Sequence, residues 1–167
     1  GGAFYNADGR TILTHCTLTG NTAPAGKGSG VASYGDNATE TVVKNTLISG
    51  NGGSSVDFVI STSNNSFTSQ GGNLIGSGNA TGDFNQPGDV PNDTPKLSPL
   101  GYFGGPVQTM HPLIGSPAID AIVTPDPGGT DARGFPRYVN GDSASAGAQL
   151  DIGAVEAGRL LVTSVGG

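Results

Sequence analysis

Five charged residues in the C-terminal half of the sequence have the types and spacing for acid–base chemistry. Asp120, Asp131, Asp151 and Glu156 supply carboxylates, and Arg133 supplies one guanidinium. Such a group could form an acidic site with a single cation. It could instead be a structural network, because guanidinium–carboxylate pairing is directional and would pin an irregular segment. We favour the structural network and predict that Arg133 lies within salt-bridge distance of Asp120, Asp131 or Asp151.

A second pair of carboxylates, Asp8 and Asp36, has a separation of about 28 residues, which is in the range of solenoid repeats. In a stacked repeat of that period they would lie about 5 Å apart, which is the carboxylate separation of a retaining glycosidase. Both residues occur in turn-forming sequences, NADG and YGDN, and the chain has no Trp that could stack on a sugar. We therefore interpret them as solvated turn residues and predict no catalytic residue, so that the protein is expected not to be an enzyme.

Three further acidic residues, Asp83, Asp89 and Asp93, fall in a stretch rich in turn formers. Carboxylate oxygens from a loop are ligands that calcium prefers. Their spacing matches neither the DxDxDG loop nor the nonapeptide repeat of calcium-binding β-rolls. We predict no metal site and no cofactor, with calcium at these three residues as the alternative.

The elements that position these residues follow from an internal repeat. The segments THCTLTGN and KNTLISGN align, and the triplets TGN, SGN and SGN start at positions 19, 49 and 77. Each repeat carries short apolar runs separated by Gly, Asn and Asp, which is typical of a three-sided β-solenoid and not of a helical repeat. The predicted strands are residues 11–13, 16–18, 31–33, 41–43, 46–48, 56–60 and 73–75. Leu13 should then stack on Val43, and Leu18 on Ile48 and Ile75.

The Asn residues of the repeated triplets, Asn21, Asn51 and Asn79, are predicted at equivalent corners. Stacked side-chain amides can hydrogen-bond along such a column. Gly-Asn also favours a turn on its own. Both interpretations are compatible with the spacing, so the sequence leaves an Asn ladder open.

Composition excludes several classes of protein. Thirty Gly, 11 Pro and few charged residues do not describe a helical domain, while the β-branched runs favour order over disorder. A net charge of −6 with seven Lys and Arg argues against nucleic acid as a partner. No run reaches the roughly 18 apolar residues that a membrane span needs. A single cysteine, Cys16, permits no internal disulfide.

Three motifs in the second half resemble a known bacterial domain. They are KLSPLGYFGGPVQTMHPLIGSPAIDA, which starts at Lys96, then TDARGFPR and DIGAVE. In this order they are similar to the choice-of-anchor Q domain, which ends secreted right-handed parallel β-helix proteins ahead of cell-surface anchoring signals. The resemblance implies an all-β chain of about three to five coils of roughly 28–30 residues, closed by a loop-rich segment. Right-handedness also follows from the general hand of parallel crossovers.

The chain is accordingly divided into four parts. Residues 1–79 are predicted to form β-helix coils, 80–95 a loop, 96–156 the terminal segment and 157–167 a strand-like tail, which could begin a further unit. Within the terminal segment, residues 107–110, 118–122 and 152–155 are predicted strands that continue or close the stack.

The expected function is that of a secreted, non-catalytic structural or adhesive protein of the cell surface, matrix or a filament. The alternatives are a fragment of a carbohydrate-active β-helix enzyme (a lyase or glycoside hydrolase) and a passive carbohydrate-binding module. Because the sequence opens in mid-repeat, we expect partners at that end. They would be coils of a longer parent chain, or copies joined end to end through the run LLVTSV. Surface polysaccharide is a further possible partner.

Overall fold

The computed structural model describes residues 1–52, 56–59, 64–91, 94–122, 129–137 and 149–158. In these ranges the chain forms short strands and one 3-10 turn, which confirms the expected all-β class. No helix in the described part is long and apolar enough to cross a membrane. The strands are β1 (Phe4–Asn6), β2 (Gly9–Thr14), β3 (Thr17–Leu18), β4 (Val31–Ser33), β5 (Thr39–Lys44), β6 (Leu47–Ile48), β7 (Val56–Val59), β8 (Asn65–Ser69), β9 (Leu74–Ile75) and β10 (Val90–Pro91), and the turn is η1 (Thr81–Asp83).

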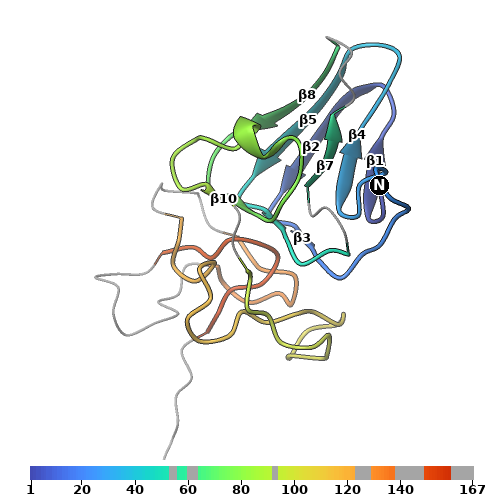
Figure 1. The fold of residues 1–167 in the computed structure, drawn as a ribbon. Helices are drawn as coiled ribbons and strands as arrows, with labels where there is room; N and C mark the ends of the chain where they lie inside the picture. The colour runs from blue at the N-terminus through green and yellow to red at the C-terminus, as the bar shows by residue number, and fades with distance from the viewer. Residues whose placement is uncertain (53–55, 60–63, 92–93, 123–128, 138–148, 159–167) are drawn as a thin grey trace, which may run out of the picture.

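The strands form three sheets in which every described pair is parallel. The strand orders are β1-β4-β7, β2-β5-β8 and β10-β9-β6-β3. The chain visits one strand of each sheet and then returns to the first sheet, so β1, β2 and β3 are followed by β4, β5 and β6 (Figure 1). Successive passes pair Thr17 with Leu47 and Leu47 with Leu74. This arrangement is compatible with the β-solenoid that the repeat predicts.

The apolar column predicted from the repeat is present. Leu18 pairs with Ile48, and Ile48 pairs with Ile75. Leu13 likewise pairs with Val43. Ile48, Ile75 and Val43 have no exposed surface, and burying a side chain of this size stabilises the fold by about 1.5–3 kcal/mol. The stacking of like on like therefore supplies the core.

Three strands go beyond the sequence prediction, namely β1, β8 and β10. The β8 sequence NSFTS contains one apolar residue, Phe67, which is buried opposite Thr41. Strand β10 lies inside residues 80–95, and its Val90 pairs with Leu74. The prediction that all of 80–95 is a loop was therefore wrong, because the chain returns to extend the third sheet.

One end of the stack is closed by η1. The ring of Phe84 lies 5.9 Å from that of Phe67, centroid to centroid. Ala80 and Phe84 are both buried in the cluster that contains Ile75. At the opposite end, formed by β1, β2 and β3, the core residues Phe4 and Leu18 are only partly buried. The two ends of the stack are therefore different.

The described residues of the terminal segment pack on the third sheet. Leu47 and Leu74 of that sheet share a buried cluster with Ile122, Leu150 and Ile152. The segment lies below the sheets in Figure 1. Pairing within its described residues consists of isolated antiparallel bridges, such as Ile122 with Leu150. The predicted strands at 107–110, 118–122 and 152–155 were therefore wrong: residues 117–120 form a turn in which Asp120 has a φ of 51°, and Gly153 has a φ of 108°, values far from those of a regular strand.

Candidate functional site

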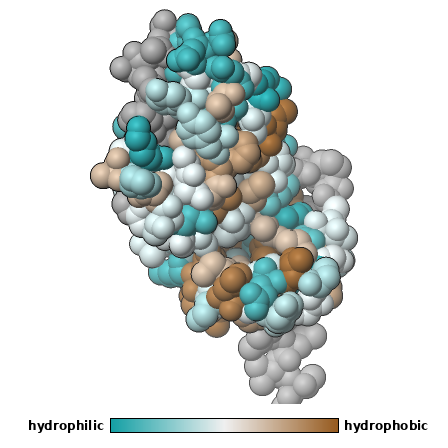
Figure 2. Space-filling model, turned by 90° about the vertical axis from the view of Figure 1, so that its right-hand side faces the viewer, coloured by the Kyte–Doolittle hydropathy of each residue, from teal (hydrophilic) through white to brown (hydrophobic). Residues whose placement is uncertain are grey.

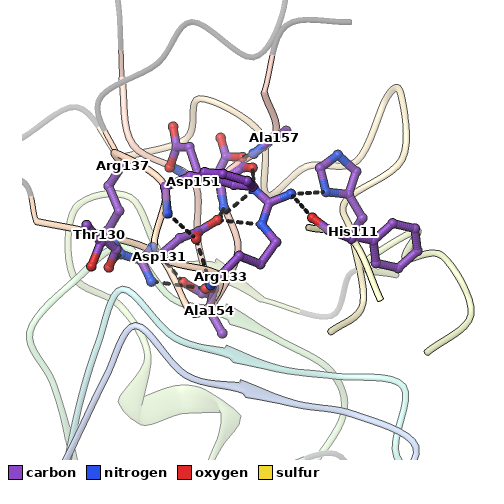
Figure 3. A network of polar contacts seen from close by, with 12 residues as sticks. His111, Thr130, Asp131, Arg133, Arg137, Asp151, Ala154 and Ala157 are labelled. Atoms are coloured by element: carbon purple, nitrogen blue, oxygen red, sulfur yellow. Dashed lines mark hydrogen bonds and ion pairs between the residues drawn. The ribbon is translucent and has the colours of Figure 1, made fainter. Parts of the chain in front are cut away.

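The polar residues of the terminal motifs meet in a buried network (Figure 3). Its centre is the turn that carries Asp131 and Arg133. This turn is closed by the Asp131 N–H, which donates to the carbonyl of Phe135 at 2.8 Å, and by the Gly134 N–H, which donates to the carbonyl of Asp131 at 2.9 Å. Gly134 has a φ of 91°, a conformation that residues with a side chain rarely adopt. The glycine of TDARGFPR thus allows the turn to fold back on itself.

Arg133 pairs with Asp131, as predicted. Its Nε and Nη2 atoms donate to Oδ2 of Asp131 at 2.8 and 2.6 Å. Nη2 also donates to the carbonyl of Glu156 at 2.6 Å. The other carboxylate oxygen of Asp131 accepts the N–H groups of Arg133 and Phe135. Because the Glu156 N–H donates to Oδ2 of Asp131, the pair ties residues 131–135 to the end of the DIGAVE motif.

Asp151 makes a second junction. Its Oδ1 accepts the N–H of Asp120 at 2.7 Å, and its Oδ2 accepts the N–H of Ala157. The Asp151 N–H in turn donates to Oε2 of Glu156 at 3.1 Å. Asp120 has a φ of 51°, which is unfavourable for a residue with a side chain, and the hydrogen bond from its N–H to Asp151 helps to hold this conformation. Asp151 therefore joins three parts of the terminal segment through main-chain hydrogen bonds.

The pKa values of Asp131 and Asp151 are shifted in opposite directions. Burial raises the pKa of Asp151 to about 6, against the lowering effect of the Ala157 and Asp120 N–H groups. Burial also acts to raise the pKa of Asp131, but the Arg133 side chain and three backbone N–H groups hold it below its usual value. Asp131 is thus a stable anion, while Asp151 titrates close to neutral pH.

Arg137, the second arginine of TDARGFPR, belongs to the network although the sequence reasoning did not select it. Its Nη1 donates to the carbonyl of Gly153 at 3.0 Å, and its Nη2 to that of Ala154 at 3.2 Å. Nε donates to the carbonyl of Thr130 at 3.2 Å. The residue is 5% exposed. The available signal was a second arginine in the same motif as Arg133, because a guanidinium near a buried turn needs several acceptors.

The network reaches the surface on the side of His111. Nη1 of Arg133 lies 3.5 Å from Nδ1 of His111 and 3.5 Å from the carbonyl of Phe103. The Phe103 and His111 rings are 5.8 Å apart, and the Arg133 guanidinium lies 5.0 Å from the Phe135 ring. Burial, and then the Arg133 charge, lower the pKa of His111. This histidine is therefore neutral at physiological pH.

Two contacts fasten the network to the stack. The Ala154 N–H donates to Oγ1 of Thr17 at 2.9 Å, and the Gly153 N–H donates to the carbonyl of Asn45 at 3.0 Å. A Cβ on Gly153 would lie 2.6 Å from Oγ1 of Thr17, and its φ is 108°. The glycine of DIGAVE thus permits the close approach to β3.

The Asn ladder is present for one step. Nδ2 of Asn21 donates to Oδ1 of Asn51 at 3.0 Å, and Nδ2 of Asn51 donates to the carbonyl of Leu18 at 3.0 Å. The register of β6 and β9, which pairs Ile48 with Ile75, brings Gly78 and not Asn79 to the level of Asn51. The side chain of Asn79 is exposed. The predicted equivalence of Asn79 was wrong, because the coil is shorter by one position than the spacing of the triplets.

The two calcium candidates within the described residues, Asp83 and Asp89, belong to no metal-binding group. Asp89 accepts hydrogen bonds from Ser69 Oγ at 2.6 Å and from the N–H groups of Asn73 and Gln86 at 2.9 Å. Asp83 is exposed on η1, and Asp93 lies outside the described residues. No group of three His, Cys, Asp or Glu in the described part could hold a metal ion. Asp89 instead fastens the 80–95 segment to β8 and β9.

Asp8 and Asp36 lie in neighbouring turns, where the Asp8 carboxylate is held by hydrogen-bond donors of the 36–37 turn. The carboxylate of Asp8 accepts the N–H and Nδ2 of Asn37 at 2.9 and 3.2 Å, and these bonds lower its pKa. Asp36 is exposed. The two residues occupy turns, as the sequence predicts.

The described network holds its carboxylates against main-chain donors and arginine, and leaves none of Asp131, Asp151 and Glu156 more than 5% exposed. Its geometry is suited to fastening a segment, since a catalytic acid needs to reach a substrate. Comparison with protein-family models, with curated proteins and with solved structures gives no significant match to the chain.

Proposed function

We propose that this chain is part of a secreted, non-catalytic structural or adhesive protein built on a right-handed parallel β-helix. In this proposal the choice-of-anchor Q-like segment, residues 96–156, seals the side of the helix. The proposal is supported by the three parallel sheets, which the chain visits in rotation, and by the stacking of Leu18, Ile48 and Ile75 in successive passes. Its partners would be other coils, either of a longer parent chain or of further copies.

The observation that carries the non-catalytic role is the burial of the motif carboxylates. Asp131 is engaged by Arg133 and by backbone N–H groups, and Asp151 by two backbone N–H groups. A buried carboxylate that is saturated with internal donors stabilises its surroundings and cannot reach a substrate.

The proposal is tested by incubating the purified chain with pectin, alginate and xylan and measuring new reducing ends. We expect no release above the buffer control. Steady release that is abolished by Asp8→Asn or Asp36→Asn would establish an enzyme and overturn the proposal.

A second candidate, a passive carbohydrate-binding surface, is favoured by one observation. Tyr102, Phe103 and Phe135 are 70%, 36% and 45% exposed, and Arg133 and His111 lie against two of these rings. Exposed aromatic groups of this kind mark binding surfaces. A glycan array would report binding that Tyr102→Ala weakens and that Tyr5→Ala, at a 49% exposed tyrosine in β1 of the first sheet, does not.

A further inference from the structure

Strand β3 is the last strand of its sheet, whose order is β10-β9-β6-β3. The Leu47 N–H donates to the carbonyl of Cys16 at 2.8 Å. Leu47 lies opposite Thr17 in the register of this parallel pair. In such a ladder its main-chain hydrogen bonds go to the two residues that flank Thr17, namely Cys16 and Leu18, so the N–H and C=O of Thr17 point away from β6. Beyond the end of β3, the Gly20 N–H donates to the carbonyl of Gly50 at 3.2 Å. In the described residues the next main-chain bond to this sheet is made by Gly20 and not by Thr19, so the N–H of Thr19 is not part of the ladder.

These outward groups border a groove of about 460 Å³. One wall is the edge of β3 and the other is formed by the terminal segment, with Leu100, Val107 and Met110 among its residues. None of the described residues that line the groove is charged. Figure 2 shows apolar surface gathered over the lower part of the molecule, where Figure 1 places the terminal segment. The groove thus combines main-chain hydrogen-bonding groups with an apolar, neutral wall.

This end of the stack is the one that lacks an apolar cover in the described residues. Phe84 covers the core at the opposite end, where its ring packs on Phe67. At the β3 end, Leu18 is half-buried, whereas Ile48 and Ile75, its neighbours in the same column, have no exposed surface. One more apolar residue stacked on Leu18 would complete the column. The end therefore favours an added strand of the same kind.

The sequence of the chain contains such a strand. The third sheet repeats a short pattern, TLIS at 46–49 and NLIG at 73–76, with two apolar residues followed by a small one. Residues 160–163, which lie outside the described part, read LLVT, and residues 160–167 carry no charged side chain. An uncharged apolar strand matches a neutral apolar groove, whereas a charged one would lose its hydration there.

We propose that residues 160–165 of a second copy bind in this groove as a strand parallel to β3. The inference rests on the structural role proposed above and names the partner. Aligning the shared pattern places Val162 over Leu18. Val162 then donates its N–H to the carbonyl of Thr17 and accepts the N–H of Thr19. The tail and the groove are different surfaces, so the contact is heterologous and, repeated from copy to copy, builds a fibre.

The test is sedimentation velocity of the full chain over a range of concentrations. The native chain should form species that grow with concentration. Thr19→Pro removes the N–H of the groove, and Val162→Pro removes the N–H of the tail, and the first change leaves the described hydrogen bonds between β3 and β6 in place. Each variant alone should associate at least about tenfold more weakly, because each lost bond between desolvated partners is worth roughly that factor.

An equimolar mixture of the two variants should stop mainly at the dimer. The intact tail of Thr19→Pro fits the intact groove of Val162→Pro, and the remaining groove and tail bind at least about tenfold more weakly, so dimers predominate. A stable monomer of the native chain at every concentration overturns the proposal, and so does a mixture without dimer. Neither result bears on polysaccharide cleavage, so failure here is distinguishable from failure of the proposed function.

A second pair of variants avoids any effect of proline on folding. Val107, in the groove wall, is 50% exposed, and Leu113, which does not line the groove, is 47% exposed. Val107→Glu should abolish assembly by placing a charge against the apolar tail, whereas Leu113→Glu should leave it intact. Equal assembly by these two variants would contradict the groove as the docking site.

Discussion

The guanidinium of Arg133 lies 2.6 Å from Oδ2 of Asp131, two residues earlier in the chain, and the same nitrogen donates to the carbonyl of Glu156. A pair this close in sequence could form in an isolated turn, but the third partner comes from 23 residues away. The pair therefore connects the local turn at residues 131–133 to Glu156 at the end of the terminal segment. Its side chains are 7% and 0% exposed, so the contact is shielded from solvent and salt.

Removing Arg133 should destabilise the fold strongly. Arg133→Ala leaves Asp131 as a buried anion without its cation, a change that typically costs about 3–5 kcal/mol. The free energy of unfolding in urea would measure this loss. The matched control is Arg10→Ala, because Arg10 pairs with Glu40 at 2.7 Å on the surface. The control should change stability little, and equal losses in the two variants would refute the buried-tie assignment.

Asp151 should make the native state less stable as pH rises from about 4 to 6. Its folded pKa of about 6 lies above the ordinary 3.8, so the native state binds the extra proton in this interval. The favourable contribution is complete below the unfolded pKa and is lost as pH rises through the folded pKa. Relative to Asp151→Asn, the native chain should lose up to about 1.4 kcal/mol per pH unit across this window.

Asp131 supplies a control of opposite sign for that titration. Its pKa is lowered in the folded state, so its contribution is present above the ordinary pKa and is lost as pH falls through the folded value. Urea unfolding at several pH values should show the native chain losing stability toward acid relative to Asp131→Asn. Parallel pH profiles for the two variants would contradict the assigned environments.

The single step of the Asn ladder should be measurable. Asn51→Ala deprives the Asn21 N–H and the Leu18 carbonyl of their side-chain partner, which we expect to cost about 1–3 kcal/mol. Asn79→Ala alters an exposed residue and should stay within about 0.5 kcal/mol. Thermal unfolding of the two variants compares them directly. A loss at Asn79 as large as that at Asn51 would restore the predicted ladder of three Asn residues.

The closed end of the stack depends on Phe84. Phe84→Ala removes the ring that packs on Phe67 and should cost about 3–5 kcal/mol. Hydrogen exchange should show loss of protection first in β8, the strand beneath the ring. Phe103→Ala, at a ring that is 36% exposed, is the comparison and should leave the exchange of β8 unchanged. Unaltered β8 protection in Phe84→Ala would show that the turn does not close this end.

Much of the repeat region could be predicted from the sequence alone. The recurring TGN and SGN triplets, and the alternation of short apolar runs with Gly and Asn, led to the parallel pairing of Leu13 with Val43 and of Leu18 with Ile48. These inferences succeed because each coil repeats the same local chemistry, so one pass of the chain predicts the next. The contact between Arg133 and Asp131 was also predictable, since the two residues share one tight turn.

Tertiary structure alone decided the rest. Asp151 meets the N–H of Asp120 across 31 residues, and Arg137 meets carbonyls 16 and 17 residues away. No local pattern encodes those partners, because buried polar groups take whichever complementary group the packing brings near. The same applies to Asn79, which the triplet aligned with Asn51 but the register of β6 and β9 moved by one position. Sequence spacing counts residues, whereas register is set by which side chains fill the core.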